Sequence, residues 1–194
     1  VFLGKAVQTV NPPSGSVGIS QLSATGTKDA TTFLRGDNTF ATPAGGDLTP
    51  AFFVRSSSTQ SLTSNSITKV TLDTEVIDTD NAFDNSTNYR FTVPSGEAGK
   101  YFFYASVDLF HASSDMKQEY IYIYKNGSSL ELKSFHGNGN ANLRRNVLNY
   151  STVLDLSAGD YIEIYTYQES ASSGSADIRA NNNATHFGGF KLIT

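Results

Sequence analysis

Residues 120–124 constrain the fold most, because tyrosine and isoleucine alternate through them without a break, as YIYIY. Strict alternation predicts a strand with two different faces. Asn126-Gly127 follows closely and is the preferred two-residue turn of a β-hairpin. The chain contains no convincing apolar period of 3.6 residues over three turns. The sequence therefore predicts an all-β fold.

Further strands are predicted where short apolar runs are bounded by turn residues. Residues 161–167, YIEIYTY, repeat the two-faced pattern and follow a turn at residues 157–160. The remaining candidates are residues 51–55, 67–72, 88–93, 101–110, 130–135, 147–156 and 187–193. About ten short strands of this kind favour an antiparallel two-sheet jelly-roll sandwich.

The tyrosines of these two strands lie opposite the isoleucines, on a face that a monomeric sandwich fills with charged residues. A second face of this kind suits contact with another subunit. We therefore predict an interface between copies of the chain, which contains Tyr120, Tyr122, Tyr124, Tyr161 and Tyr165. The alternative is that these tyrosines are half-exposed strand formers.

The chain divides into three segments. Residues 1–13 end in two prolines and are predicted to be the end of an upstream domain. Residues 14–50 are predicted to be an extended neck, in which Phe33 and Phe40 are buried when several copies run side by side. Residues 51–194 contain the predicted strands and form the folded head domain.

The composition excludes several classes of protein. The chain has no cysteine, so neither disulfides nor thiolate metal sites hold it together. A net charge of −4 without a Lys/Arg run argues against a nucleic-acid partner. No continuous apolar segment is long enough to span a bilayer, so membrane insertion is not expected.

Only 16% of the residues are charged, which is typical of extracellular and virion β proteins. Because the first residue is Val1, we expect a fragment or a processed product.

No catalytic motif is present. His111, His136 and His186 do not have the spacing of a two-histidine metal motif, and the sequence contains no GxSxG. The chain also lacks the long repeats on which tail-spike depolymerases place their paired carboxylates. We expect neither an enzyme nor a cofactor.

An oxygen-rich loop over residues 78–85 is a weak candidate for a hard cation such as Ca²⁺. Its carboxylates are Asp78, Asp80 and Asp84. The loop lacks the glycine and the final glutamate of an EF-hand, so a solvated loop is favoured and no metal is expected.

Two polar loops, residues 136–145 and 169–185, are the preferred candidates for contact with a receptor. Asn, Arg and Tyr side chains suit a glycan, through amide and guanidinium hydrogen bonds to its hydroxyls and ring stacking on its sugar faces, although the absence of Trp argues against a lectin. Plain solvated loops are the alternative. The candidate contact residues are His136, Asn138, Asn140, Arg144, Arg145, Asn181 and Asn182.

The neck contains the string TFLRGDNTFATP at residues 32–43, which resembles the linker that precedes the distal knob in many bacteriophage tail-fibre proteins. Asn38 stands where that family usually has glycine. The Arg35-Gly36-Asp37 tripeptide lies inside this string, where a turn is favoured over an integrin motif.

The head resembles the complement C1q globular-head and tumour-necrosis-factor superfamily through four strings in the right order. They are YRFTVP followed by GKYFF at residues 89–103, IYIYKNG at 121–127, LDLSAGDYI at 154–162 and FGGFKLI at 187–193. The resemblance implies a ten-stranded jelly roll that assembles as a homotrimer. The collagen stalk of the animal members is absent, and the phage-type neck stands in its place.

Together these features predict a trimeric phage fibre protein whose head attaches to a host-cell receptor, preferably a glycan. Its expected partners are its own copies, a tail or head component that the N-terminal part contacts, and the receptor. We expect it on the virion surface after assembly in the host cytoplasm. The alternatives are a purely structural head fibre or decoration spike, and a secreted complement-like lectin.

Overall fold

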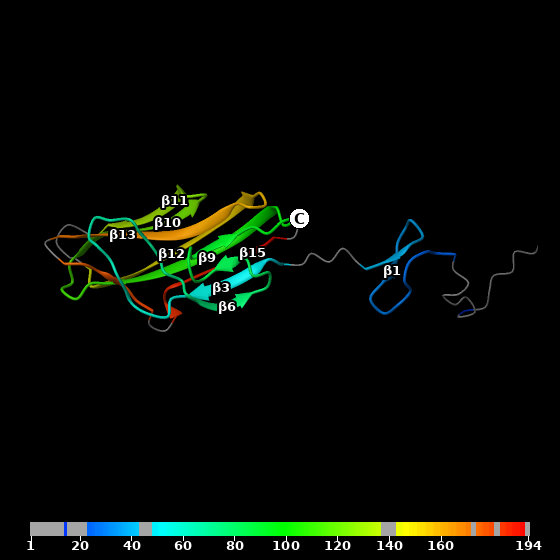
Figure 1. Cartoon of the computed structure of the whole chain (residues 1–194), viewed down its shortest axis with the longest axis horizontal. Helices are drawn as coiled ribbons and strands as arrows, with labels where there is room; N and C mark the ends of the chain where they lie inside the picture. Colours follow the sequence, from blue (N-terminus) through cyan, green and yellow to red (C-terminus); the bar gives the residue numbers. More distant parts are fainter. Residues whose placement is uncertain are drawn as a thin grey trace, which may run out of the picture. The chain divides into compact units, whose positions relative to one another are not determined.

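In the computed structural model, two antiparallel β-sheets pack face to face as a sandwich (Figure 1). The structure describes residues 14, 23–42, 48–136, 143–171, 174–180 and 183–192, and only the backbone of residues 131–136. The chain divides into two units, Val1–Gly45 and Gly46–Thr194, which we describe separately. The sandwich belongs to the second unit.

The two sheets lie in separate layers in Figure 1. The first contains, in order, β11 (Ser128–His136), β10 (Met116–Lys125), β13 (Tyr161–Ser170), β8 (Arg90–Thr92) and β7 (Phe83–Asp84), with β5 (Thr68–Lys69) paired to β13. The second contains β12 (Arg145–Leu156), β9 (Gly99–Phe110), β15 (His186–Lys191), β3 (Ala51–Arg55) and β6 (Thr74–Asp78). Beyond the end of β15, β14 (Asp177–Ile178) pairs with β9, and β4 (Gln60–Ser61) pairs with β14.

The predicted antiparallel two-sheet sandwich is confirmed, and each predicted strand overlaps an observed one. The sequence missed β6 and the two-residue segments β4, β7 and β14. The two-residue segments are too short to show an alternation, and β6, with the sequence TEVID, has two adjacent apolar residues and does not alternate. Only the pairing with a neighbour reveals them.

The core between the sheets is built around aromatic rings. Phe52 lies 4.8 Å from Phe91 and 4.9 Å from Phe187, measured between ring centroids. Tyr101 and Phe103 point inward from β9 and are fully buried. Burial of each such side chain contributes roughly 1.5–3 kcal/mol. The core therefore fixes which side of each strand faces the other sheet.

The closing strand β15 carries two glycines that allow this packing. A Cβ atom on Gly189 would lie 2.5 Å from Cδ1 of Phe103 in the core. A Cβ atom on Gly188 would lie 2.5 Å from the hydroxyl of Tyr104, on the opposite side of the same sheet. Both sides of β15 are thus covered by aromatic rings, and only glycine fits beneath them.

The predicted hairpin turn at Asn126-Gly127 is confirmed by φ angles of 52° and 77°. Asp160, in the turn before β13, accepts a hydrogen bond from the Asn126 amide at 2.7 Å and pairs with Lys125 at 2.8 Å. These two contacts lower the pKa of Asp160 to about 2. The carboxylate therefore ties the two turns together.

The first unit contains a short hairpin where the sequence predicted an extended neck. Its strands are β1 (Phe33–Leu34) and β2 (Phe40–Ala41). The connecting turn includes Asn38, whose φ of 63° is in the left-handed region that asparagine tolerates well. The Arg-Gly-Asp tripeptide is thus part of a turn, as expected. Phe33 remains 62% exposed.

None of the described segments forms an apolar helix long enough to cross a membrane.

Candidate functional site

The two loops predicted to contact a receptor meet at one aromatic ring, that of Phe110 at the end of β9. The guanidinium carbon of Arg144, from the first loop, lies 5.2 Å from the ring centroid. That of Arg179, from the second loop, lies 4.4 Å from it. We call Arg144, Arg145, Arg179 and Phe110 the arginine site. Arg179 was not predicted from the sequence, because its position beside Arg144 depends on tertiary structure.

Arg145 contributes to this site through a two-pronged ion pair. Its guanidinium donates hydrogen bonds to both carboxylate oxygens of Asp108, at 2.8 and 2.9 Å. Asp108 is fully buried, whereas the Arg145 side chain is half exposed. The hydrogen bond to Asp108 raises the pKa of Arg145 above its ordinary value. Arg145 therefore compensates a buried charge and keeps one side open to solvent.

The backbone of Asp108 also fixes the second loop. Its carbonyl accepts a hydrogen bond from the Arg179 N–H at 2.8 Å, and its N–H donates to the Thr185 hydroxyl at 3.1 Å. The Thr185 hydroxyl in turn donates to the Arg179 carbonyl at 2.7 Å. The backbone on which Arg179 stands is thus held against β9.

The arginine site lies at the end of the sandwich opposite the point where the chain enters it. The other end of β9 is joined to the last described residues, because the Leu192 N–H donates to the Lys100 carbonyl at 2.7 Å. The Lys191 N–H donates to the Pro50 carbonyl at 3.1 Å, where the chain enters the sheet. At about 3.3 Å per residue, β9 separates the two ends by about 35 Å.

The other predicted contact residues are placed only in part. His136 ends β11, where its backbone pairs with Gln118. Asn138, Asn140, Asn181 and Asn182 lie outside the described residues.

The predicted tyrosine face is a continuous cluster on β10 and β13. We call Tyr120, Tyr122, Tyr124, Tyr165 and Tyr167 the tyrosine cluster. Tyr120 lies 5.2 Å from Tyr167, and Tyr124 lies 4.1 Å from Tyr165. Burial raises the pKa of Tyr122 above its ordinary value. Tyr161 instead contacts the Arg90 guanidinium, 4.1 Å from its ring centroid.

A second aromatic surface lies on the outer side of the other sheet and was missed by sequence reasoning. Its rings are 5.4 to 6.3 Å apart, and we call it the aromatic sheet face: Phe53, Phe102, Tyr104, His186 and Phe190. In residues 101–104, YFFY, aromatic side chains occupy both sides of β9, so alternation alone does not reveal a distinct outer face. Counting aromatic residues on both sides of that strand would have found it.

The aromatic sheet face continues into exposed aliphatic side chains. Val153 of β12 is 51% exposed and Ile77 of β6 is 52% exposed. Tyr104 and His186 line a hollow of about 230 Å³, together with Asn149 and Ser151. Half-buried aromatic rings and exposed aliphatic side chains thus lie together on the outer side of this sheet.

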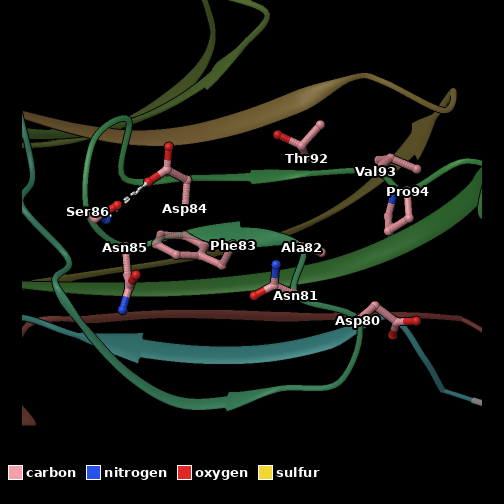
Figure 2. A pocket seen from close by; sticks show the side chains of 10 residues that line it. All are labelled: Asp80, Asn81, Ala82, Phe83, Asp84, Asn85, Ser86, Thr92, Val93 and Pro94. Carbon is pink, nitrogen blue, oxygen red and sulfur yellow. Dashed lines mark hydrogen bonds between the residues drawn. The ribbon is translucent and has the colours of Figure 1, made fainter.

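The oxygen-rich loop lines a separate open pocket of about 500 Å³ (Figure 2). The Asp84 carboxylate accepts hydrogen bonds from the N–H groups of Ser86, Thr87 and Asn88, which hold its pKa well below the usual range. Asp80 lies at the other end of the pocket in Figure 2.

The third carboxylate of this loop, Asp78, accepts bonds from the N–H groups of Ala82 and Phe83. The carboxylates of Asp78 and Asp84 therefore stabilise the backbone turns of this loop. Among the described residues, no three acidic or histidine side chains group closely enough to hold a metal ion.

Comparison with known proteins places the sandwich in a familiar fold. A family model described as the C1q domain matches residues 51–192. The globular domain of zebrafish complement 1qA is 20% identical, with a TM-score of 0.50, and the match covers 74% of this chain and 97% of that one. The Eiger TNF of S. frugiperda is 11% identical, with a TM-score of 0.55 and coverages of 73% and 91%.

Murine APRIL is similar in the same way, at 18% identity, a TM-score of 0.53 and coverages of 73% and 98%. At these identities the solved structures establish the fold alone. No curated protein matches the sequence.

Proposed function

This chain belongs to the C1q domain family, and on that premise we propose that it forms the trimeric receptor-binding end of a bacteriophage fibre. The family is non-enzymatic, and its members typically form homotrimeric binding modules. The finer assignment, to a phage fibre and to host attachment, is our proposal.

The neck supports the phage assignment. Its TFLRGDNTFATP string resembles the linker of phage tail-fibre proteins, and its hairpin leaves Phe33 62% and Leu34 46% exposed. Exposed apolar side chains in so small a unit are buried when parallel copies meet. We propose that Phe33 and Phe40 contact the other two necks, and that the N-terminal part contacts a tail or head component of the virion.

We propose that the head trimerises through the aromatic sheet face. Phe102 and Phe190 lie 5.5 Å apart on this face and offer apolar area without hydroxyl groups. A cyclic trimer joins two different patches on each subunit. The sequence instead predicted an interface at the tyrosines of β10 and β13. Substitutions in the aromatic sheet face and in the tyrosine cluster distinguish these two interfaces.

The arginine site carries the proposal of receptor binding. Both loops predicted for contact supply an arginine to one ring, at the end of the sandwich far from the chain's entry. In a trimer three such sites act together, so weak individual contacts give strong attachment. We propose a glycan receptor on the host surface, and a location on the virion exterior after assembly in the host cytoplasm.

Adsorption competition tests this function. Purified chain is added to host cells together with the phage that encodes it, and the rate of phage adsorption is measured. We expect the rate to fall as the concentration of the chain rises. No binding of the chain to any susceptible host would instead favour a structural head fibre or decoration spike.

A secreted complement-like lectin is the second candidate, and the similarity to zebrafish complement 1qA favours it. A gene neighbourhood without tail or baseplate genes would support this candidate and argue against a phage fibre.

A further inference from the structure

We infer that His186 makes assembly of the trimer depend on pH, so that acid loosens the trimer and weakens attachment. This inference rests on the proposed trimerisation through the aromatic sheet face and describes its regulation. Histidine is the side chain whose charge ordinarily changes between about pH 5 and pH 8. His186 is the member of the aromatic sheet face that gains a positive charge in this range.

His186 lies among the rings of the proposed interface. Its ring centroid is 5.4 Å from that of Phe53 and 6.1 Å from that of Tyr104. It also lines the hollow of about 230 Å³, with the uncharged side chains of Asn149 and Ser151. The side chain is half-buried in the single chain, so a neighbouring copy on this face excludes the remaining water from it. Removal from water disfavours the charged form of a histidine.

The hydrogen bond of the ring identifies the nitrogen that carries the proton in the neutral form. Nδ1 of His186 lies 2.9 Å from the backbone carbonyl oxygen of Asn183, which can only accept. Nδ1 therefore carries a proton in both charge states, and Nε2 of the neutral ring is an acceptor. In acid the second proton binds to Nε2 and gives the ring its positive charge.

A permanent positive charge stands next to His186. Arg55 is its directly opposed partner on β3, and the Arg55 guanidinium donates a hydrogen bond to the side-chain oxygen of the same Asn183. None of the described acidic side chains forms an ion pair with Arg55. Like charges directly opposite each other on neighbouring strands are destabilising. A proton on His186 therefore creates a repulsion, which becomes stronger when an interface excludes water.

The acidic groups of the same sheet do not offset this repulsion. Asp108 of β9 is taken by its ion pair with Arg145. Glu75 of β6 is separated from His186 by the whole of β3. Burial raises the pKa of the neighbouring Tyr104, which therefore stays neutral. The remaining carboxylates of the sheet have partners of their own: Asp78, Asp155 and Asp177.

The charged groups at the arginine site lie farther away. Arg144 and Arg179 contact the ring of Phe110, and the buried Asp115 lies beyond the end of β9. Phe110 is four residues from Ser106, the β9 partner of His186, or about 13 Å along the strand. Arg55 is thus the charge that a protonated His186 meets first.

The sign of the pH dependence follows from these contacts. A separated chain exposes His186 and binds the second proton more readily than the trimer does. Dissociation therefore takes up protons, and the trimer weakens as the pH falls through the histidine range. Burial raises the pKa of Glu119 in the core, which stabilises the fold of each chain in acid. The two groups act in opposite directions on two separate equilibria, folding and assembly.

Subunit exchange measures the stability of the trimer at each pH. Two samples of the full chain are labelled at the N-terminal amine, one with a fluorescent donor and one with an acceptor. After mixing, energy transfer reports the rate at which trimers exchange chains. We expect exchange to be at least about tenfold faster at pH 5.5 than at pH 7.5, because each chain that leaves the trimer exposes its histidine to protonation.

Two substitutions of His186 fix its charge. His186→Phe keeps an aromatic ring without a titratable group, and its exchange rates at the two pH values are expected to agree within about twofold. His186→Lys is charged at both pH values and is expected to exchange at least about tenfold faster than wild type at pH 7.5. Circular dichroism of each variant checks that the sandwich is folded.

His111→Asn is the matched control, because it removes a histidine that lies outside the aromatic sheet face. The asparagine oxygen can replace His111 Nδ1, which accepts a hydrogen bond from the Ser113 N–H at 3.2 Å. This variant is expected to keep the same ratio of exchange rates as wild type.

Two results would overturn the inference: wild type exchanges at the same rate at both pH values, or His186→Phe keeps the ratio of wild type. Sedimentation and cell binding separate this failure from failure of the proposed function. A trimer that exchanges equally at both pH values keeps the proposed assembly and loses the pH dependence. A trimer that exchanges faster in acid but binds no host cell keeps the pH dependence and loses the receptor role. A chain that sediments as a monomer at both pH values overturns the assembly and the inference together.

Discussion

Arg145 and Asp108 form a two-pronged ion pair, at 2.8 and 2.9 Å, in which the carboxylate is fully buried and the guanidinium half exposed. The same aspartate bonds through its backbone to Arg179 and Thr185. One residue of β9 thus organises the ends of two loops that lie far apart in the sequence.

Replacing Arg145 by glutamine is expected to lower the melting temperature by several degrees, because a buried carboxylate loses its partner. Calorimetry of Arg145→Gln, Asp108→Asn and the double variant measures this pair as a double-mutant cycle. The double variant is expected to lose less unfolding free energy than the two single variants lose together. Strict additivity would show that the pair is not coupled.

Gly189→Ala is expected to destabilise the sandwich by about 1–3 kcal/mol, because the added Cβ meets the Phe103 ring in a packed core. Chemical unfolding followed by tyrosine fluorescence measures the change. Gly36→Ala is the control, since nothing lies within 4 Å of the Cβ atom it adds. A loss in Gly36→Ala equal to that in Gly189→Ala would contradict the packing explanation.

Glu119 makes the stability of the sandwich depend on pH. It points into the core opposite Gln168, and its Oε1 has no hydrogen-bond partner within the described residues. Burial raises the pKa of Glu119 to about 7. Between the ordinary value of 4.5 and about 7, the unfolded chain loses this proton before the folded chain does. The contribution of Glu119 to the free energy of unfolding is therefore fully present below pH 4.5 and is lost as the pH rises toward 7.

The melting temperature is accordingly expected to fall between pH 4.5 and pH 8, and Glu119→Gln is expected to flatten this fall because the amide does not ionise. Thermal unfolding followed by circular dichroism at several pH values measures both. The same slope in wild type and variant would show that another group causes the pH dependence.

The sequence predicted the sandwich because its signals are local. The alternation of Tyr120–Tyr124 and the Asn126-Gly127 turn each specify their own structure. The candidate site depends on contacts that no local pattern contains. Arg144 and Arg179 share a ring although 35 positions separate them, and Arg179 stands in no recognisable motif.

The polarity of a residue does not reveal its burial. Glu119 stands beside a run of tyrosines, and the sequence alone makes no prediction for it, yet it is fully buried on the isoleucine side of β10. On β9, aromatic residues on both sides concealed the outer surface that we propose as the trimer interface. Only the position of the second sheet shows which rings belong to the core.

The two candidate interfaces are separated by paired substitutions. Phe102→Ser with Phe190→Ser is expected to disrupt the trimer, because both rings lie on the aromatic sheet face. Tyr122→Ser with Tyr165→Ser is expected to leave the trimer intact, and sedimentation velocity measures both pairs. The opposite pattern would place the interface at the tyrosine cluster.

Several of our proposals require a trimer, among them the burial of the aromatic sheet face and the combined action of three arginine sites. Light scattering of the full chain, coupled to size-exclusion chromatography, measures the mass in solution most directly. The account predicts three times the chain mass of 20.9 kDa, about 63 kDa, at micromolar concentration. A mass of 20.9 kDa would contradict it.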